Sequence, residues 1–401
     1  MTRVLFWGDA QLESGLTLGH GEYGPGSRAE DQEGMLKRIV DIADEESCDI
    51  VVNLGDSFER PYPAPWAIVA LKSLVDDLDE LDKGQVVLLG NHDMKSPALP
   101  TILGVFGSEH VHVSQTPELI AVDDIVFATL PWSPISRLVA SMDGVPRGEL
   151  RQFAIDALVL AAITLRERCA GEHPEKTPIL LVHWSVSGSL LPGAAGRVDD
   201  LPNDPVIPWQ DLDALGFTIV ACGHIHRPQM IGAEQGATTP MFYVGSPMIN
   251  NFGEEGTPHG CFLFDTVARE LRFIEIPDRP FLTFDVDLAV ADDWALLAKA
   301  SQTELEGAII RARFEGTAEQ IAAADVSGAQ RKLLELGARK VFPKTDVVRS
   351  SRARVELIDE TVSDVEALEL WIGALGPDEI DPDLLSAIRE QHLRYLEEAS
   401  L

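Results

Sequence analysis

Short apolar runs alternate with longer amphipathic segments through the first half of the chain. The apolar runs are rich in Val, Ile and Leu, which is typical of buried strands. The predicted strands are Val4–Trp7, Ile50–Leu54, Val86–Leu89, Ile125–Leu130, Ile179–Val182 and Thr218–Ala221. The predicted helices between them are Ala29–Glu46, Pro65–Leu81 and Gly148–Cys169. Strands that alternate with helices predict a layered α/β fold.

The pattern changes at Met241, where strand-like runs follow one another without long helices. The runs MFYVG, CFLFD and LRFIEI begin at Met241, Cys261 and Leu271. We expect these runs to form a second sheet that packs on the first. The segment IPDRP, from Ile276 to Pro280, then marks a domain boundary because it is rich in turn-forming residues.

Three domains are predicted from this pattern. Residues 1–278 form the largest domain, and residues 279–355, which open with the strand-like run FLTFDVDL, form a smaller α/β domain. Residues 356–401 form a tail with two helical patterns. The first carries an apolar stripe, and the second begins with Asp381 as N-cap and Pro382 at the first helical position.

The composition limits the classes of function. The chain of 401 residues holds 32 Lys and Arg against 65 Asp and Glu, for a net charge of −33. This charge disfavours a generally basic nucleic-acid surface but allows a local basic face or a metal site that attracts phosphate. The four cysteines form no CxxC pair, which predicts a reduced, cytoplasmic protein. No signal peptide is predicted, and no apolar stretch reaches the ~20 residues that span a bilayer.

Potential metal ligands follow five of the predicted strands. They are Asp9 in GDAQ, Asp56 in GDSFER, Asn91 and His92 in GNHD, His183 in LLVHW, and His224 and His226 in GHIH. Each of them alone could be an ordinary turn, cap or core residue. In open α/β sheets, however, ligands bind at the carboxyl ends of strands, so we expect these side chains to surround one cleft. Carboxylate, amide and imidazole groups without thiolates suit Mn²⁺, Fe²⁺ or Zn²⁺.

As a set, the motifs GD, GDxxxR, GNHD, H and GHxH resemble those of the calcineurin-like metallophosphoesterases. The stretches GHIHRPQM, YVGSPMINNFGEEG and HGCFLFD narrow the resemblance to nucleases of the SbcD and meiotic-recombination-eleven type. These motifs lie within residues 1 to about 265, and the remaining chain is similar mainly in order and length. The resemblance implies a four-layer αββα core, a small α/β capping domain and a C-terminal helical tail.

The resemblance also implies a site for two divalent metal ions, with Mn²⁺ as the expected ion. Asp56 would bridge both ions. The other implied ligands are Asp9, Gln11 and His226 for the first ion, and Asn91, His183 and His224 for the second. His92 would face the scissile phosphate and protonate the leaving oxygen, since an imidazole titrates in the useful range. Asp93 would orient His92.

Gln11 departs from the resemblance, because the first motif of these proteins is Asp-x-His and this chain has Asp9-Ala10-Gln11. A neutral amide oxygen is a weaker metal ligand than an imidazole. Three alternatives stay open: Gln11 binds the first ion weakly, it holds a water that does so, or His20 from the following loop replaces it. Each predicts weaker binding of the first ion, or a preference for a harder ion, in a site that still works.

The expected activity and partners come from the resemblance. It implies hydrolysis of DNA, exonucleolytic on duplex ends and endonucleolytic on single strands or hairpins. It also implies a homodimer and a partner ATPase of the SbcC type, an ABC ATPase with a coiled coil, on which the tail would dock. The alternative for the tail is that its apolar stripes pack on their own domain. Two rival functions remain, a phosphoesterase of small phosphoesters and a scaffold that holds DNA ends with an impaired first metal site.

A basic segment near the end of the second predicted domain is a candidate DNA-binding face. Residues 331–354 hold eight basic and two acidic residues. Such charges bind phosphates, although an ordinary solvated surface is the alternative. With Arg60 of GDSFER, the candidate DNA contacts are Arg331, Lys332, Arg339, Lys340, Lys344, Arg349, Arg352 and Arg354.

Two irregular segments, Ser14–Ser27 and Ser187–Gln210, either border the substrate groove or are solvated connections. Trp132 and Trp184 are expected near strand ends. Both residues either stack on a base or pack in the core, and packing is the favoured interpretation.

Overall fold

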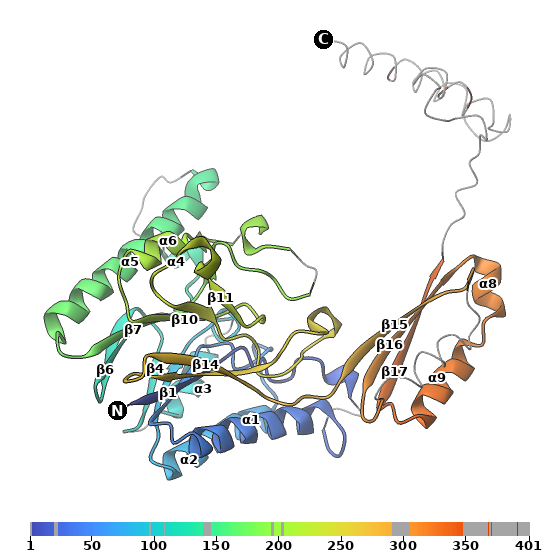
Figure 1. Ribbon diagram of the computed structural model, residues 1–401, viewed down its shortest axis with the longest axis horizontal. Helices are drawn as coiled ribbons and strands as arrows, with labels where there is room; N and C mark the ends of the chain where they lie inside the picture. The colour runs from blue at the N-terminus through green and yellow to red at the C-terminus, as the bar shows by residue number, and fades with distance from the viewer. Residues whose placement is uncertain are drawn as a thin grey trace.

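The computed structural model describes residues 2–347, except for 20–22, 96–97, 108, 139–145, 194–195, 202–203 and 291–304. Beyond residue 347 it describes only Leu368, Leu370 and Gln391. Two six-stranded sheets form the main body, and a three-stranded sheet lies to one side of them (Figure 1). No described helix is both long and apolar enough to cross a membrane.

The first sheet has the strand order β14-β13-β1-β2-β3-β4. Strands β1 to β4 are mutually parallel, whereas β13 runs antiparallel to β1 and β14 antiparallel to β13. The register pairs Val4 of β1 with Ile50 of β2 on one side and with Phe264 of β13 on the other. The strand bounds are Arg3–Trp7 (β1), Ile50–Asn53 (β2), Gly84–Leu88 (β3), Val111–Ser114 (β4), Gly260–Asp265 (β13) and Glu270–Glu275 (β14).

The second sheet has the order β11-β12-β10-β7-β6-β5. Its four central strands are parallel, and the edge strands β5 and β11 are antiparallel to their neighbours. The bounds are Glu118–Val122 (β5), Ile125–Leu130 (β6), Thr177–His183 (β7), Ile219–Gly223 (β10), Gln229–Ile231 (β11) and Met241–Tyr243 (β12). A separate two-stranded pair joins Ser185–Val186 (β8) to Val206–Ile207 (β9).

Helices cover the outer faces of both sheets (Figure 1). α1 (Arg28–Glu45), α2 (Pro65–Glu80) and α3 (Ala98–Val105) pack on the first sheet, whereas α4 (Ile135–Leu138), α5 (Leu150–Glu172) and α6 (Trp209–Asp213) lie with the second. Ser27 caps α1 by accepting a hydrogen bond from the Glu30 N–H, and Pro65 takes the first position of α2, as their residue types favour. The short 3-10 helices are Leu16–Leu18 (η1), Arg147–Glu149 (η2), Val198–Asp200 (η3), Ala233–Gln235 (η4) and Phe252–Glu254 (η5).

A third apolar layer lies between the two sheets. Phe6 of the first sheet and Phe242 of the second meet there in an edge-on contact with ring centroids 5.6 Å apart. The order of layers is therefore helices, sheet, sheet, helices, which confirms the predicted four-layer αββα fold. All nine elements predicted over the first half are present, with shifts of at most a few residues at their ends.

The prediction for the runs after Met241 was wrong in one respect. They do not form a sheet of their own: β12 joins the second sheet beside β10, while β13 and β14 extend the first sheet beyond β1. The physical reason is that β1, the first described strand, pairs with β2 on one side only, and the later strand β13 pairs with its other edge. The first and last strands of the main body thus lie in one sheet.

The third sheet begins at Phe281 and has the parallel order β15-β16-β17, with bounds Phe281–Asp287, Ile309–Gly316 and Lys340–Val347. The helices α8 (Ala318–Ala323) and α9 (Val326–Glu335) accompany it. We call this unit the cap. It contacts the N-terminal end of α1, where the buried Arg28 lies 5.4 Å from the Phe281 ring centroid. Arg279, just before the cap, binds Asp31 of the same helix. The predicted division at residues 278 and 355 stays a prediction, and the tail lies outside the described residues apart from three positions.

Candidate metal centre

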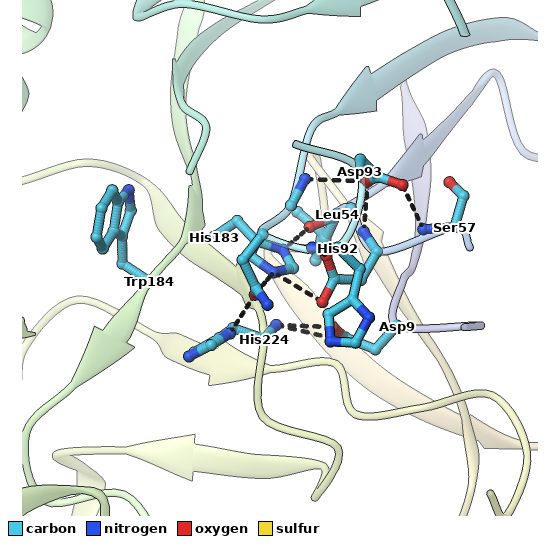
Figure 2. Close-up of polar contacts among 12 residues, drawn as sticks. Asp9, Leu54, Ser57, His92, Asp93, His183, Trp184 and His224 are labelled. Carbon is cyan, nitrogen blue, oxygen red and sulfur yellow. Dashed lines mark hydrogen bonds and ion pairs between the residues drawn. The ribbon is translucent and has the colours of Figure 1, made fainter. Parts of the chain in front are cut away.

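The predicted ligands meet at the carboxyl ends of parallel strands from both sheets. Asp9, Asp56 and Asn91 follow β1, β2 and β3 of the first sheet, whereas His183 ends β7 and His224 follows β10 of the second. Strands of both sheets point their carboxyl ends at one region, so side chains far apart in the sequence come together there (Figure 2). The clustering expected from the sequence is therefore present.

The backbone at this region takes conformations that are costly for residues with side chains. Four candidate ligands have positive φ angles: Asp9 (53°), Gln11 (41°), Asp56 (54°) and His224 (100°). Such strain persists only where the surrounding structure enforces it, and it concentrates at functional sites. Gly90 has a related role, because a Cβ there would lie 2.6 Å from Cε1 of His183. The glycine of the GNHD motif thus lets the loop approach the imidazole.

Four side chains form the closest part of the cluster. Ligand atoms of Asp56, His183 and His224 all lie within 4.8 Å of one another. The Oδ1 atom of Asn91 lies 3.2 Å from Nε2 of His183 and 2.9 Å from Nδ1 of His224. These four residues are the predicted protein ligands of the second ion, and their donor atoms face a common point.

The predicted ligands of the first ion are less closely assembled. The buried carboxylate of Asp9 accepts a hydrogen bond from the His224 N–H, with Oδ2 2.9 Å from the nitrogen. Gln11 is buried, with 8% of its surface exposed. His226 lies close enough to Asp9 to influence its pKa. The alternative ligand His20 falls outside the described residues, so the three alternatives for Gln11 remain predictions.

Three candidate histidines, His183, His224 and His226, each have a polar partner on one ring nitrogen. Nδ1 of His183 lies 2.6 Å from the Leu54 carbonyl oxygen, and Nδ1 of His226 lies 2.8 Å from Oε1 of Glu254. His224 uses Nε2, which lies 3.2 Å from Asp204. Partners of this kind fix the ring and leave the other nitrogen for a metal ion.

Sequence reasoning missed both carboxylates, Asp204 and Glu254. Asp204 lies in the irregular segment 187–210, and Glu254 lies in the FGEEG part of a motif that carried the resemblance. Their positions in these segments were the only signal, since neither follows a predicted strand.

The buried charges explain the direction of the pKa shifts. Burial alone would lower the pKa of His183, but the Asp56 carboxylate outweighs it and raises the pKa to about 9. Burial likewise opposes the charged form of Asp56, yet the neighbouring His183 holds the pKa of Asp56 below its ordinary value. The pKa of Asp9 is raised, chiefly because the carboxyl is buried. Two buried carboxylates thus depend on positive charge in the same cluster.

His92 lies beside this cluster. Its backbone N–H donates to Oδ1 of Asp56 over 2.7 Å, and its ring Nδ1 lies 3.1 Å from Oε2 of Glu59 and 2.8 Å from Nζ of Lys95. Burial alone would lower the pKa of His92, but the hydrogen bond to Glu59 and the charge of Asp56 produce a net rise. Glu59, which sequence reasoning also missed, belongs to the GDSFER motif.

Asp93, which was expected to orient His92, binds backbone N–H groups of the ligand loops. Its buried carboxylate accepts hydrogen bonds from the backbone N–H groups of Asp56, Ser57 and Gly90, at 2.7, 3.1 and 3.0 Å (Figure 2). Burial and the nearby Asp56 raise the pKa of Asp93 to about 7. Within the described part of the chain it makes no hydrogen bond to the His92 ring. The contacts therefore favour a role in holding two ligand loops together.

Trp184 lies in the apolar core beside the second sheet and Trp132 packs against that core, which agrees with the interpretation favoured from the sequence. Trp132 and Trp184 stack with ring centroids 5.9 Å apart, and the Trp184 indole N–H donates to the Pro131 carbonyl. Within its described residues, the segment Ser187–Gln210 contributes β9, η3 and Asp204.

The predicted DNA contacts are only partly described. Arg60 is exposed and pairs with Glu13 at 3.5 Å. Arg339 and Lys340 point to the main body, where Lys340 donates to the carbonyls of Thr17 and Gly19, each over 2.6 Å. Arg331, Lys332 and Lys344 lie on α9 and β17, whereas Arg349, Arg352 and Arg354 lie outside the described residues. Binding of DNA by these residues stays a prediction.

The sequence is similar to a known family over more than half of its length. A sequence profile described as calcineurin-like phosphoesterase matches residues 2–228. The chain is also 22% identical over 270 residues to the SbcD component of the nuclease SbcCD from Staphylococcus saprophyticus subsp. saprophyticus. That match covers 65% of this chain and 66% of the relative, just under two thirds of its length.

Two solved structures are similar at low identity. TT1561 of Thermus thermophilus is 12% identical with a TM-score of 0.40, over 69% of this chain and 99% of that chain. A dimetal phosphatase from Danio rerio is 13% identical with a TM-score of 0.38, over 65% of this chain and 91% of that chain.

Proposed function

Since this chain belongs to the calcineurin-like phosphoesterase family, we propose that it is a DNA nuclease that uses two divalent metal ions, with Mn²⁺ as the working ion. Members of the family are hydrolases that use divalent metals. The observation that carries the proposal is the convergence of Asp56, His183 and His224, whose ligand atoms lie within 4.8 Å of one another.

The residues present fit a divalent metal. The donor set consists of carboxylate oxygens, an amide oxygen and imidazole nitrogens, which suits Mn²⁺. Two buried carboxylates, Asp9 and Asp56, need compensating positive charge at this place. Asp56 lies between the two predicted sets and would contact both ions. The second ion would be held by Asn91, His183 and His224, and the first by Asp9, Gln11 and His226.

When bound, two such ions would lower the pKa of a water to about 7 and would stabilise negative charge on a phosphodiester. The chain's own residues complete the reaction. His92 holds a proton for the leaving oxygen, and its backbone bond to Asp56 fixes its position relative to the ligands. Glu59 orients the ring from Nδ1. Asp93 keeps the loops of Asp56 and Gly90 at a constant distance.

DNA is favoured as the substrate over small phosphoesters for two reasons. The SbcD relative, which is similar over 65% of this chain, is a nuclease by name. The cap is a separate sheet beside the main body, and a small substrate would not require it. A scaffold that only holds DNA ends is the non-enzymatic alternative. It is favoured by Gln11, a neutral amide at the position where the resembled motif has a histidine.

A nuclease assay tests the proposed function. The full chain is incubated with Mn²⁺, with Mg²⁺ and without metal, on labelled duplex DNA, hairpin DNA and bis-p-nitrophenyl phosphate. We expect Mn²⁺-dependent cleavage of DNA. Hydrolysis of the small phosphodiester alone would support the esterase alternative, and DNA binding without any hydrolysis would support the scaffold.

Replacing Gln11 with His should tighten the first metal site. An imidazole is a stronger and better-directed ligand than a neutral amide oxygen, and Asp9, Asp56 and His226 would supply the other protein ligands of this ion. We expect Mn²⁺ binding about tenfold tighter, which corresponds to about 1.4 kcal/mol. Calorimetric titration of Mn²⁺ into both proteins measures the change. Weaker binding by a folded Gln11→His protein would mean that the site is built around glutamine.

Deleting residues 356–401 should leave metal-dependent cleavage largely intact but remove binding to a partner. All predicted metal ligands precede Phe252, whereas the tail carries apolar stripes that need a surface to cover them. The proposed partner is an SbcC-type ATPase, in an assembly built on a dimer of this chain. A pull-down with the base of such an ATPase's coiled coil is the measurement, and undiminished binding by the shortened protein would refute the docking role.

A further inference from the structure

The short 3-10 helix η5, Phe252–Glu254, lies between the metal centre and the cap. We propose that Glu254 is a positioning residue for His226, and that the cap fixes Glu254 by holding both ends of this turn. The inference rests on the proposed metal site, and it adds a route by which the position of the cap governs the affinity of the first ion.

Glu254 is held at both carboxylate oxygens. Oε1 lies 2.8 Å from Nδ1 of His226, and Oε2 accepts a hydrogen bond from the Asn250 N–H over 2.8 Å. The residue is buried, with only 2% of its surface exposed. A buried carboxylate held in this way determines the rotation of the imidazole and increases the electron density on Nε2. Nε2 is the atom left free to bind the first ion.

The same turn is attached to the cap on either side of Glu254. The Phe252 ring contacts both Phe281 and Arg311, with the two ring centroids 5.0 Å apart and the guanidinium carbon 4.6 Å from the Phe252 centroid. Glu255 accepts a hydrogen bond from the Thr283 N–H over 2.7 Å. Phe281 and Thr283 belong to β15, so the first strand of the cap holds the residues that flank Glu254.

This arrangement couples the position of the cap to the first metal site. A displacement of β15 moves Phe252 and Glu255 directly, and Glu254 cannot keep its place between Asn250 and His226 if both neighbours move. The first site is also the one that has Gln11 in place of an imidazole, so it depends more on the remaining histidine. Glu254 therefore strengthens the ligand on which the first ion relies most.

Calorimetric titration of Mn²⁺ into the full chain tests the first part of the proposal. Glu254→Gln keeps the size of the side chain but removes its charge, and the matched control is Glu270→Gln, an exposed glutamate of β14. We expect Glu254→Gln to lower the affinity of one of two sites by about 10- to 100-fold, while the control binds like the wild type. Equal binding by Glu254→Gln and wild type would overturn this inference alone. Absence of Mn²⁺ binding by the wild type would overturn both the inference and the metal site of the proposed function.

A second variant tests the attachment to the cap. Phe252→Ala leaves Glu254 and His226 unchanged but loosens the turn, and we expect the affinity of the same site to fall by about 2- to 30-fold. Unchanged affinity would overturn the coupling to the cap. If Glu254→Gln does not fold, as judged by circular dichroism, the structure of the wild type with Mn²⁺ decides. Glu254 bound to Nδ1 of His226, with Nε2 on the ion, supports the proposal, and any other ligand geometry at His226 overturns it.

Discussion

Replacing Asp56 with Asn is expected to abolish metal binding and hydrolysis together. The Asp56 carboxylate is buried in the cluster, 3.4 Å from Nε2 of His183. Its charge also raises the pKa of Asp9 and contributes to the raised pKa of His226, two residues of the other predicted ligand set. An amide there offers one neutral oxygen in place of a charge shared by two cations. Losing several kcal/mol of that interaction lowers the rate by about 10³-fold or more.

Metal analysis and cleavage assays on the same preparation check this prediction. The matched control is Asp79→Asn, which changes an exposed aspartate of α2 and should behave like the wild type. An Asp56→Asn protein that still holds two Mn²⁺ ions and cuts DNA at the normal rate would rule out the bridging role.

The second large effect is expected for His92→Ala, which should keep its metal ions and lose most of its turnover. The His92 ring contacts Glu59 and Lys95 and is not one of the clustered donors, so its removal leaves the ligand set complete. General acid catalysis by a placed side chain contributes about 10²- to 10⁴-fold, and we expect a loss of that size.

The decisive comparison for His92 is between kcat and bound metal, measured together. His112→Ala, on the exposed side of β4, is the control for loss of a histidine in general. Loss of an ion from the His92→Ala protein would instead make His92 a ligand or a support of the ligand loop.

The sequence was most informative about candidate ligands that stand directly at the end of a strand. Asp9, Asp56 and His183 each terminate an apolar run, and runs of that kind can be recognised without knowing how the strands are ordered. The carboxyl ends of parallel strands meet at one edge, so the cluster follows from the runs themselves. The metal-facing residues were therefore predictable as a group.

The residues that contact the candidate ligands from behind, Glu254 and Asp204, could not be predicted from the sequence. Glu254 and Asp204 lie 28 and 20 residues from the histidines that they contact, in segments with little regular structure. Their contacts depend on how loops cross the end of the sheets, and no periodicity in the sequence encodes such a crossing. For the same reason Asp93, predicted to orient His92, instead binds backbone N–H groups that only the folded loops bring together.

The order of strands in the first sheet has a consequence for synthesis on the ribosome. β1 emerges well before its partner β13, which lies about 260 residues later, with Val4 opposite Phe264. Until then one edge of β1 is open, and an open apolar edge can pair with another chain. The carboxylates also emerge before the histidines, since Asp9 and Asp56 precede His183 and His224. The nascent chain therefore carries an acidic half-site and an exposed strand edge until the later strands emerge, and the candidate metal centre is completed only when those strands dock.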